Sequence, residues 1–228
     1  MLAAANTDAV WTEFVSSLDN LDAQSEIESG HRLLMPEHSP RLQVKPFTSA
    51  LNKAFRIDCL HNGLWPELPA ERGTNAWFRP GNAHEILNDL VRTSVYCRFL
   101  DGATDLADRL QKIGEVHDRN VTVDLRADEN GYYAVHAGIP INAIVTSQRW
   151  NAEEIEFRLE VQFATMTQWV LRTLSHDLYE RRRTKPAPNN EGWKWSPSSE
   201  TFKTNYLGHL LHYADGMMVE LRDRDRND

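Results

Sequence analysis

The sequence predicts an α+β fold in which helices flank a mixed β-sheet of about five strands. The clearest observation is residues 155–163, IEFRLEVQF, where apolar and polar residues alternate as in a strand with one packed face. A glycine turn followed by an apolar run at 132–141 predicts a second strand. Helical patterns occur between the strands and at both ends of the chain, which indicates helices packed against the sheet.

The chain begins with helical patterns and a long loop. Residues 7–22 have apolar residues at helical spacing, with Thr7 in the N-cap position, and a polar stretch follows to about residue 39. Residues 45–60 predict a second helix with Pro46 at its first position, where a proline is tolerated because its missing N–H has no partner in the helix. Residues 60–82 are rich in Gly, Pro and Asn, which predicts a loop, and residues 84–90 predict a short helix.

The rest of the chain alternates between strand and helix patterns. In the helix that follows the clearest strand, Met166, Val170, Leu174 and Leu178 lie at helical spacing, and we expect them to face inward. In order, the predicted elements are strands at 91–99, 119–126, 132–141 and 155–163, with helices at 101–114, 164–183 and 201–224 and a loop at 184–199.

Composition excludes several classes of protein. The formal charge of −8 argues against a dedicated binder of duplex DNA. No run of 18 apolar residues occurs, so we expect no membrane span, and the N-terminus lacks a basic leader, so we expect a cytoplasmic protein. The absence of CxxC and HExxH motifs argues against a structural zinc site.

Strand alternation places a set of polar side chains on one face of the predicted sheet. Side chains two residues apart in a strand share a face, so polar residues of three strands gather on one side if the strands share a sheet. Such a face would form the floor of a cleft, although an antiparallel sheet often has one simply solvated polar face. The set is Arg92, Ser94, Arg98, Tyr132, His136, Arg158, Glu160 and Gln162.

A row of basic residues precedes and follows the start of the second predicted helix. Arg41, Lys45, Ser49, Lys53 and Arg56 are spaced by four, four, four and three residues. The last three share a helix face, and Lys45 lies at the N-terminus, where backbone N–H groups favour an anion. The row predicts a phosphate-binding site, and a solvated basic helix face is the alternative.

Five segments resemble one family, in the same order and at compatible spacing. They are K-x3-S-x3-K from Lys45, DLVRTSVYCRF, NGYYAVH, EVQFAT and LRTLSHDLYE. Together they resemble the synthetase domain of RelA/SpoT-type alarmone synthetases. The resemblance covers about residues 40–183 and implies a nucleotidyltransferase-like synthetase fold. It leaves residues 1–39 as an N-terminal helical extension and residues 184–228 as a loop and a C-terminal helix packed on the same domain, as in a stand-alone small synthetase.

The resemblance implies an ATP-dependent pyrophosphokinase that uses Mg²⁺ and transfers the β,γ-pyrophosphate of ATP to the 3′-OH of a purine nucleotide. Asp89 and Glu160 correspond to the catalytic, magnesium-binding carboxylates. The remaining roles are ATP binding for Lys45, Ser49, Lys53 and Arg56, acceptor binding for Gly131, Tyr132 and His136, and support for Arg92, Gln162 and His176. The glycine turn would let the ring of Tyr132 stack on the acceptor base.

The match departs from the family pattern at basic positions. The family's Asp-x-x-Gly-x-Arg has Arg92 for the glycine and Ser94 for the arginine. Ala164 replaces a second arginine, and Tyr133 stands where a basic residue is usual. These changes leave the acceptor open between guanosine and adenosine nucleotides, giving (p)ppGpp or (p)ppApp, and they resemble the toxic small synthetases.

Two other functions remain open. Pyrophosphorylation of the tRNA 3′ end would use the basic cluster at 181–183 and Lys185, which equally suits a helix C-terminus. A catalytically silent nucleotide sensor is disfavoured, because both Asp89 and Glu160 are present. Growth inhibition would make an antitoxin or immunity protein a candidate partner.

Overall fold

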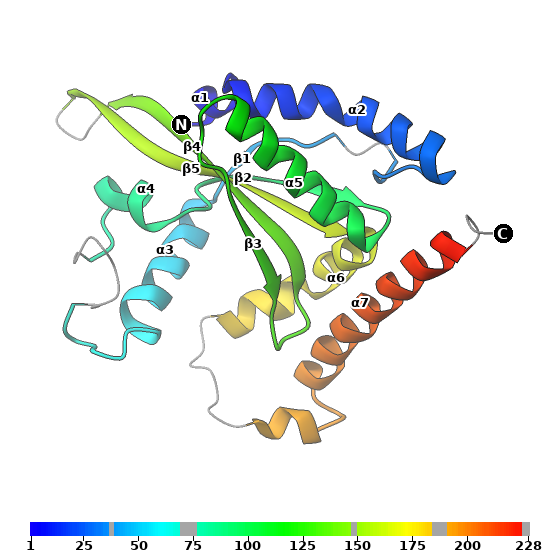
Figure 1. Cartoon of the computed structure of the whole chain (residues 1–228). Coiled ribbons are helices and arrows are strands. Elements are labelled where there is room, and N and C mark those ends of the chain that lie inside the picture. Colours follow the sequence, from blue (N-terminus) through cyan, green and yellow to red (C-terminus); the bar gives the residue numbers. More distant parts are fainter. Residues whose placement is uncertain (37–38, 69–76, 147–149, 184–190, 225–228) are drawn as a thin grey trace.

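A computed structural model describes residues 1–36, 39–68, 77–146, 150–183 and 191–224, with only the backbone described for residues 176–183 and 191. It contains a five-stranded mixed sheet flanked by helices, which confirms the predicted α+β fold class (Figure 1). In the part of the chain that the structure describes, no helix is long and apolar enough to span a membrane.

The sheet has the strand order β1-β2-β5-β4-β3. β2 and β5 are parallel, and the other neighbouring pairs are antiparallel. The four predicted strands are therefore present, and a short edge strand before the second helix adds the fifth. The strands are β1 (Gln43–Val44), β2 (Val91–Cys97), β3 (Thr122–Ala127), β4 (Tyr133–Thr146) and β5 (Ala152–Thr165).

Seven α-helices surround the sheet in the described ranges, joined by shorter helical turns. The helices are α1 (Leu2–Asn6), α2 (Ala9–Ser29), α3 (Phe47–Phe55), α4 (Ala83–Ile86), α5 (Leu100–Val116), α6 (Met166–Arg183) and α7 (Glu200–Arg224). The turns are η1 (Arg56–Leu60), η2 (Pro80–Asn82) and η3 (Glu191–Trp195). The last two lie within the predicted loops at 60–82 and 184–199, of which residues 69–76 and 184–190 lie outside the described residues.

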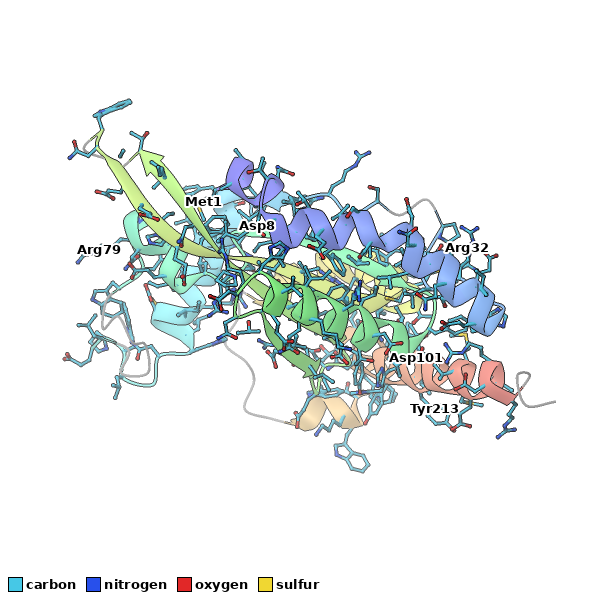
Figure 2. All side chains as sticks on the ribbon, turned by 45° about the horizontal axis from the view of Figure 1, so that its top comes forward. Met1, Asp8, Arg32, Arg79, Asp101 and Tyr213 are labelled. Atoms are coloured by element: carbon cyan, nitrogen blue, oxygen red, sulfur yellow. The ribbon has the colours of Figure 1, made fainter. Side chains whose placement is uncertain are left out.

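The helix predicted at residues 7–22, which is α2, is longer than predicted and has a different N-cap. The carboxylate of Asp8, rather than Thr7, caps α2 by accepting a hydrogen bond of 3.1 Å from the backbone N–H of Trp11. The helix continues through the polar stretch to Ser29 and ends where Gly30 adopts a left-handed conformation with φ of 72°. Figure 2 shows α2 lying along α5, with Asp8 near its start.

The apolar core lies on the face of the sheet covered by α5. Odd-numbered residues of the central strands point to this face, where Val91 pairs with Leu159 and Val135 with Phe163. α2 packs on α5 and reaches the sheet at Phe14, whose ring lies 5.8 Å from that of Phe163. The even-numbered residues are left for the opposite face, which carries the candidate site.

The prediction for the inward face of α6 was wrong. Met166, Val170 and Leu174 are exposed, and the side chain of Leu178 lies outside the described residues. Gln168 and Leu171 are buried instead. The reason is that α6 follows β5 directly and contacts the sheet through residues next to its polar face, so part of its inward surface is polar.

α7 is attached at both ends to parts of the sheet domain. Near its C-terminus, the guanidinium of Arg222 donates two hydrogen bonds, of 3.1 and 2.6 Å, to the carboxylate of Asp101 on α5. Nearer its N-terminus, Gly208 lies against Gly131, the glycine of the turn before β4. A Cβ atom on Gly208 would lie 2.2 Å from the carbonyl oxygen of Gly131, so only glycine permits this contact.

Candidate active site

Asp89 is the centre of a cluster of cations at the entrance to β2. It lies in a turn two residues before the strand, because α4 ends at Ile86 and not at the predicted residue 90. Its Oδ2 atom is 2.6 Å from Nζ of Lys45, and its Oδ1 atom is 2.7 Å from Nζ of Lys53. A guanidinium nitrogen of Arg92 lies 3.9 Å from the same carboxylate.

The two lysines keep Asp89 ionised in a buried position. Burial by itself would raise the pKa of the carboxyl, but Lys53 and Lys45 outweigh it and lower this pKa to about 2. Burial also lowers the pKa of the Lys45 ammonium, which Asp89 opposes. The side chain of Lys45 is 1% exposed and that of Lys53 is 25% exposed. Lys45 is thus enclosed with Asp89, while Lys53 reaches the carboxylate from the solvent side.

A closed ring of side chains surrounds Glu160 on β5. Gln162 donates from its amide to Oε1 of Glu160, and Nδ1 of His136 lies 3.5 Å from Oε2. The other imidazole nitrogen of His136 is 2.8 Å from the hydroxyl of Tyr132. The guanidinium of Arg172 donates a 3.0 Å hydrogen bond to Oε1 of Gln162 and lies 5.7 Å from the ring centre of Tyr132, which closes the ring.

Glu160 is also ionised at neutral pH. Burial would raise the pKa of its carboxyl, but the hydrogen bond and charge of His136, together with the hydrogen bond from Gln162, lower it. With the proton of His136 on Nδ1, Nε2 can accept from the hydroxyl of Tyr132, so the chain of hydrogen bonds runs from Tyr132 to Glu160. The two carboxylates of the site are therefore negative and face different sets of donors.

The sheet register brings the two groups together. In the parallel pair of β2 and β5, Arg92 lies opposite Glu160, and in the antiparallel pair of β4 and β5, His136 lies opposite Gln162. Arg92 thus stands between the Asp89 cluster and the Glu160 ring. The prediction that strands containing Arg92, Tyr132 and Glu160 lie in one mixed sheet is confirmed for Arg92 and Glu160, whereas Tyr132 lies just before the first residue of β4.

The turn before β4 holds Tyr132 in place. Gly131 has a φ of 80°, which favours glycine, and its N–H donates a 2.9 Å hydrogen bond to the carbonyl of Asp128. The side-chain oxygen of Asn130 accepts from the backbone N–H of Tyr132 at 3.0 Å. Tyr133 points to the other side of the strand, where its ring stacks on His212 of α7 with centroids 3.6 Å apart.

The remaining predicted residues are less central. Ser49 is half-buried on α3, one turn before Lys53, and Arg56 begins η1, where its Nε donates to the carbonyl of Asn52 at 3.4 Å. His176 lies on α6, and its side chain is outside the described residues, as are those of 181–183 and all of Lys185. The row from Lys45 to Arg56 is thus split, because two of its lysines bind Asp89.

Arg172, which completes the ring around Glu160, was not predicted as a site residue. Arg172 is the second residue of the motif LRTLSHDLYE, and it lies one turn after the buried Gln168 on α6. Only the position of α6 relative to β5 shows that this arginine reaches Gln162.

The donor set of the site fits Mg²⁺. This ion prefers hard oxygen ligands and commonly takes one or two carboxylates together with substrate phosphates. Asp89 and Glu160 are both ionised, and among the described residues no group of three or more His, Cys, Asp or Glu side chains could hold a metal. Phosphate oxygens would have to supply the other ligands, and Lys53 would have to release one oxygen of Asp89.

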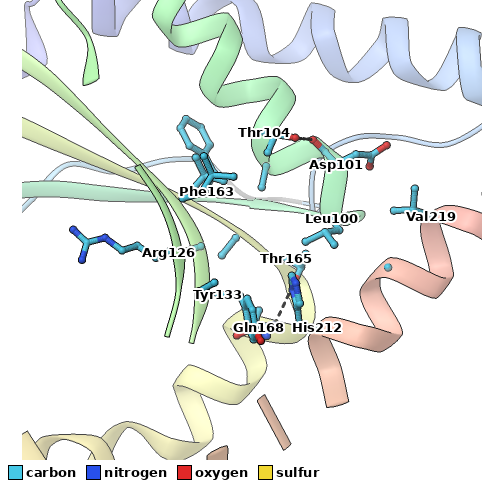
Figure 3. A pocket seen from close by; sticks show the side chains of 17 residues that line it. Leu100, Asp101, Thr104, Arg126, Tyr133, Phe163, Thr165, Gln168, His212 and Val219 are labelled. Atoms are coloured by element: carbon cyan, nitrogen blue, oxygen red, sulfur yellow. Dashed lines mark hydrogen bonds between the residues drawn. The ribbon is translucent and has the colours of Figure 1, made fainter. Parts of the chain in front are cut away.

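A pocket of about 450 Å³ opens on the opposite face of the sheet (Figure 3). It lies between α5, the β3–β4 pair and α7, and its wall is mainly apolar, with contributions from Ala103, Val135, Phe163 and Val219. Of the described residues that line it, none belongs to the predicted site. The pocket is therefore separate from the candidate site on the polar face.

The chain has the fold of the small alarmone synthetases. It is similar to small alarmone synthetase 1 from Bacillus subtilis bound to its product pppGpp, with a TM-score of 0.57 and 17% identity over 95% of this chain and 92% of that chain. It is also similar to a GTP pyrophosphokinase family protein from Streptococcus pneumoniae, with a TM-score of 0.56 and 18% identity over 99% and 93% of the two chains.

The Bacillus subtilis enzyme bound to AMPCPP is similar as well, with a TM-score of 0.54 and 19% identity over 96% of this chain and 93% of that chain. No family model and no curated protein matches the sequence. The likeness is therefore one of fold, and it confirms the synthetase fold expected from the five sequence segments.

Proposed function

We propose that the protein is an ATP-dependent pyrophosphokinase that transfers the β,γ-pyrophosphate of ATP to the 3′-OH of a purine nucleotide. The observation that carries the proposal is the pair of ionised carboxylates, Asp89 in the turn before β2 and Glu160 on the polar face of β5. One is surrounded by cations, and the other by hydrogen-bonding groups. Phosphoryl transfer requires this combination of charge neutralisation and positioning.

The Asp89 cluster is the donor half of the proposed site. Lys53 is partly exposed and can turn from Asp89 to a phosphate, while the enclosed Lys45 stays with the carboxylate. Ser49 and Arg56 extend the same helical segment. Mg²⁺, held by Asp89 and Glu160, would supply neutralisation of the triphosphate charge when bound. In solved structures of the same fold, AMPCPP and pppGpp are bound, which supports nucleotide substrates for this site.

The ring around Glu160 is the acceptor half. The ring of Tyr132 offers an aromatic surface for a base, and the hydrogen bond to His136 fixes its orientation. Glu160 would take the proton of the 3′-OH as that oxygen bonds to the β-phosphorus of ATP and the bond to the α-phosphate oxygen breaks, releasing AMP. Gln162 and His136 hold the carboxylate in position through the hydrogen bonds described above.

The acceptor would be a guanosine or adenosine nucleotide, and the product an alarmone, in a protein that acts as an alarmone synthetase or a growth-inhibiting toxin. Arg92 lies near Asp89, whereas Ser94 and Ala164 stand where the resembling family has arginines. This difference supports an arrangement of the substrate phosphates that is particular to this chain. Transfer to the 3′ end of tRNA is the second candidate, favoured by the basic residues 181–183.

The test is incubation of the protein and Mg²⁺ with ATP labelled at the γ-phosphate and each of GDP, GTP, AMP, ADP, ATP and tRNA. We expect label to move to one class of acceptor and AMP to appear in equal amount. Release of labelled inorganic phosphate alone, or label bound to the protein, would contradict the proposal. Binding of nucleotides without transfer to any of them would favour a sensor.

A further inference from the structure

Arg172 places a positive charge at the acceptor half of the site. It extends from α6 to the polar face of the sheet, where it donates to the side-chain carbonyl of Gln162 at 3.0 Å. Its guanidinium carbon lies 5.7 Å from the centre of the Tyr132 ring. Both partners are uncharged groups, and within the described ranges no carboxylate pairs with Arg172.

The two halves of the site differ in how their charges are balanced. Around Asp89, Lys45, Lys53 and Arg92 surround a single carboxylate. Other arginines near the same face are already bonded: Arg158 donates to Thr122, and Arg126 pairs with Asp124 at 2.6 Å. Arg172 therefore differs from these neighbours, because its guanidinium is directed to Gln162 and Tyr132 of the site.

We propose that Arg172 binds the 5′-phosphate of the acceptor nucleotide, an inference that rests on the proposed function. A nucleoside stacked on Tyr132 carries its 5′-phosphate beside the same ring, within reach of a guanidinium placed over it. Arginine is suited to this role because its planar N–H groups match phosphate oxygens in pairs. The hydrogen bond to Gln162 uses one nitrogen, Nη1, and orients the rest of the guanidinium.

The phosphate bound by Arg172 could belong to either of two acceptors. It could be the 5′-phosphate of a free nucleotide, or the phosphodiester before the last nucleoside of an RNA 3′ end. Both place a phosphate on the 5′ carbon of the reacting nucleoside. Arg172 would thus act on either acceptor, and the probes chosen below separate the two.

The test compares equilibrium binding of seven probes, measured by calorimetry without ATP. The probes are the nucleoside, its 5′-monophosphate and its 5′-diphosphate, each for guanosine and adenosine, and the trinucleotide CCA. The proteins are wild type, Arg172→Met, Arg172→Lys and Arg109→Ala. The methionine keeps the apolar stem of the side chain, and Arg109 is an exposed arginine of α5 that serves as a charge-matched control.

We expect Arg172→Met to weaken binding of the 5′-monophosphate and the 5′-diphosphate of one base at least tenfold. The affinity for the nucleoside of the same base should stay within twofold of wild type. Arg172→Lys should lie between, because lysine keeps the charge and loses the paired geometry, and Arg109→Ala should match wild type. A loss seen with CCA and absent with free nucleotides would assign the phosphate to an RNA end.

An equal loss for nucleoside and nucleotide in Arg172→Met would overturn the proposal, since the arginine would then only position Tyr132 and Gln162. Unchanged binding of every probe that wild type binds would overturn it too. If wild type bound none of the probes, the proposed function itself would be contradicted, and the role of Arg172 with it. Comparison of wild type with the variants therefore separates the two failures.

Discussion

The two faces of the sheet are stabilised in different ways. On the face covered by α5, Leu159, Val161 and Phe163 of β5 are fully buried among apolar side chains. On the other face, Glu160 and Gln162 from the same strand are held by hydrogen bonds and charges. Packing tolerates exchange of one apolar residue for another of similar volume. A network of hydrogen bonds and charges does not tolerate such exchange, because each polar atom has a defined partner.

The largest expected effect comes from adjacent residues on the two faces. Glu160→Gln should reduce transfer about 10³-fold or more while the protein stays folded, because the shape remains and the charge is lost. Leu159→Ala should do the reverse, lowering the free energy of unfolding by about 2–5 kcal/mol with normal turnover in the folded fraction. Urea denaturation and transfer assays on both variants check this. Near-normal turnover of Glu160→Gln would remove Glu160 from the reaction.

The next effect compares two glycines of α7. Gly208→Ala would bring a Cβ within 2.2 Å of the carbonyl of Gly131, so the turn carrying Tyr132 must move. We expect a loss of stability of about 1–3 kcal/mol and weaker acceptor binding. Gly216→Ala should stabilise the helix by about 1 kcal/mol, because a Cβ there meets nothing within 4 Å. Equal melting temperatures for the two variants would show that α7 does not support the turn.

A third prediction concerns the cation cluster and pH. The pKa of Asp89 is lowered from 3.8 to about 2, so its contribution to stability is present above pH 3.8 and is lost as the pH falls toward 2. Asp89→Asn should therefore lower the free energy of unfolding by about 2 kcal/mol at pH 7 and by about half as much at pH 3. Urea denaturation of both proteins at pH 7, 5 and 3 measures the difference.

The control for that experiment is Asp19→Asn, at an exposed position of α2, which should change stability little at any of the three pH values. A constant difference between wild type and Asp89→Asn from pH 7 to pH 3 would mean that the lysines do not stabilise the ionised carboxylate.

The smallest effect compares two adjacent tyrosines. Tyr132→Ala should weaken binding of the acceptor by about 1–3 kcal/mol, the range for base stacking on an aromatic ring. Tyr132→Phe should have a smaller effect, because it keeps the ring and loses the hydrogen bond to His136, worth about 1 kcal/mol. Tyr133→Ala should lower the melting temperature instead, since this ring stacks on His212. A Tyr132→Ala variant that melts early while its folded fraction binds acceptor normally would make Tyr132 a structural residue.

Local sequence determined the strands and most of the polar face. Alternation in a strand is set by backbone geometry, so residues 155–163 divide into two faces without reference to the rest of the chain. The helix predicted at 201–224 was confirmed within one residue for the same reason, since its pattern and length are local. Local signals were weaker at helix ends, where Asp8 rather than Thr7 forms the cap.

Tertiary structure alone decided which of these residues meet. The register of β2 against β5 places Arg92 beside Glu160, and pairing between distant segments is not encoded in the periodicity of either. Helical periodicity likewise shows which residues of α6 share a face, and it does not show which face meets the sheet. For that reason Met166 and Val170 were wrongly placed inward and Arg172 was missed. Lys45 follows β1 and Lys53 lies on α3, so their contacts with Asp89 depend in the same way on how these elements lie beside the turn before β2. A buried carboxylate is paired by whichever cations the fold brings near it.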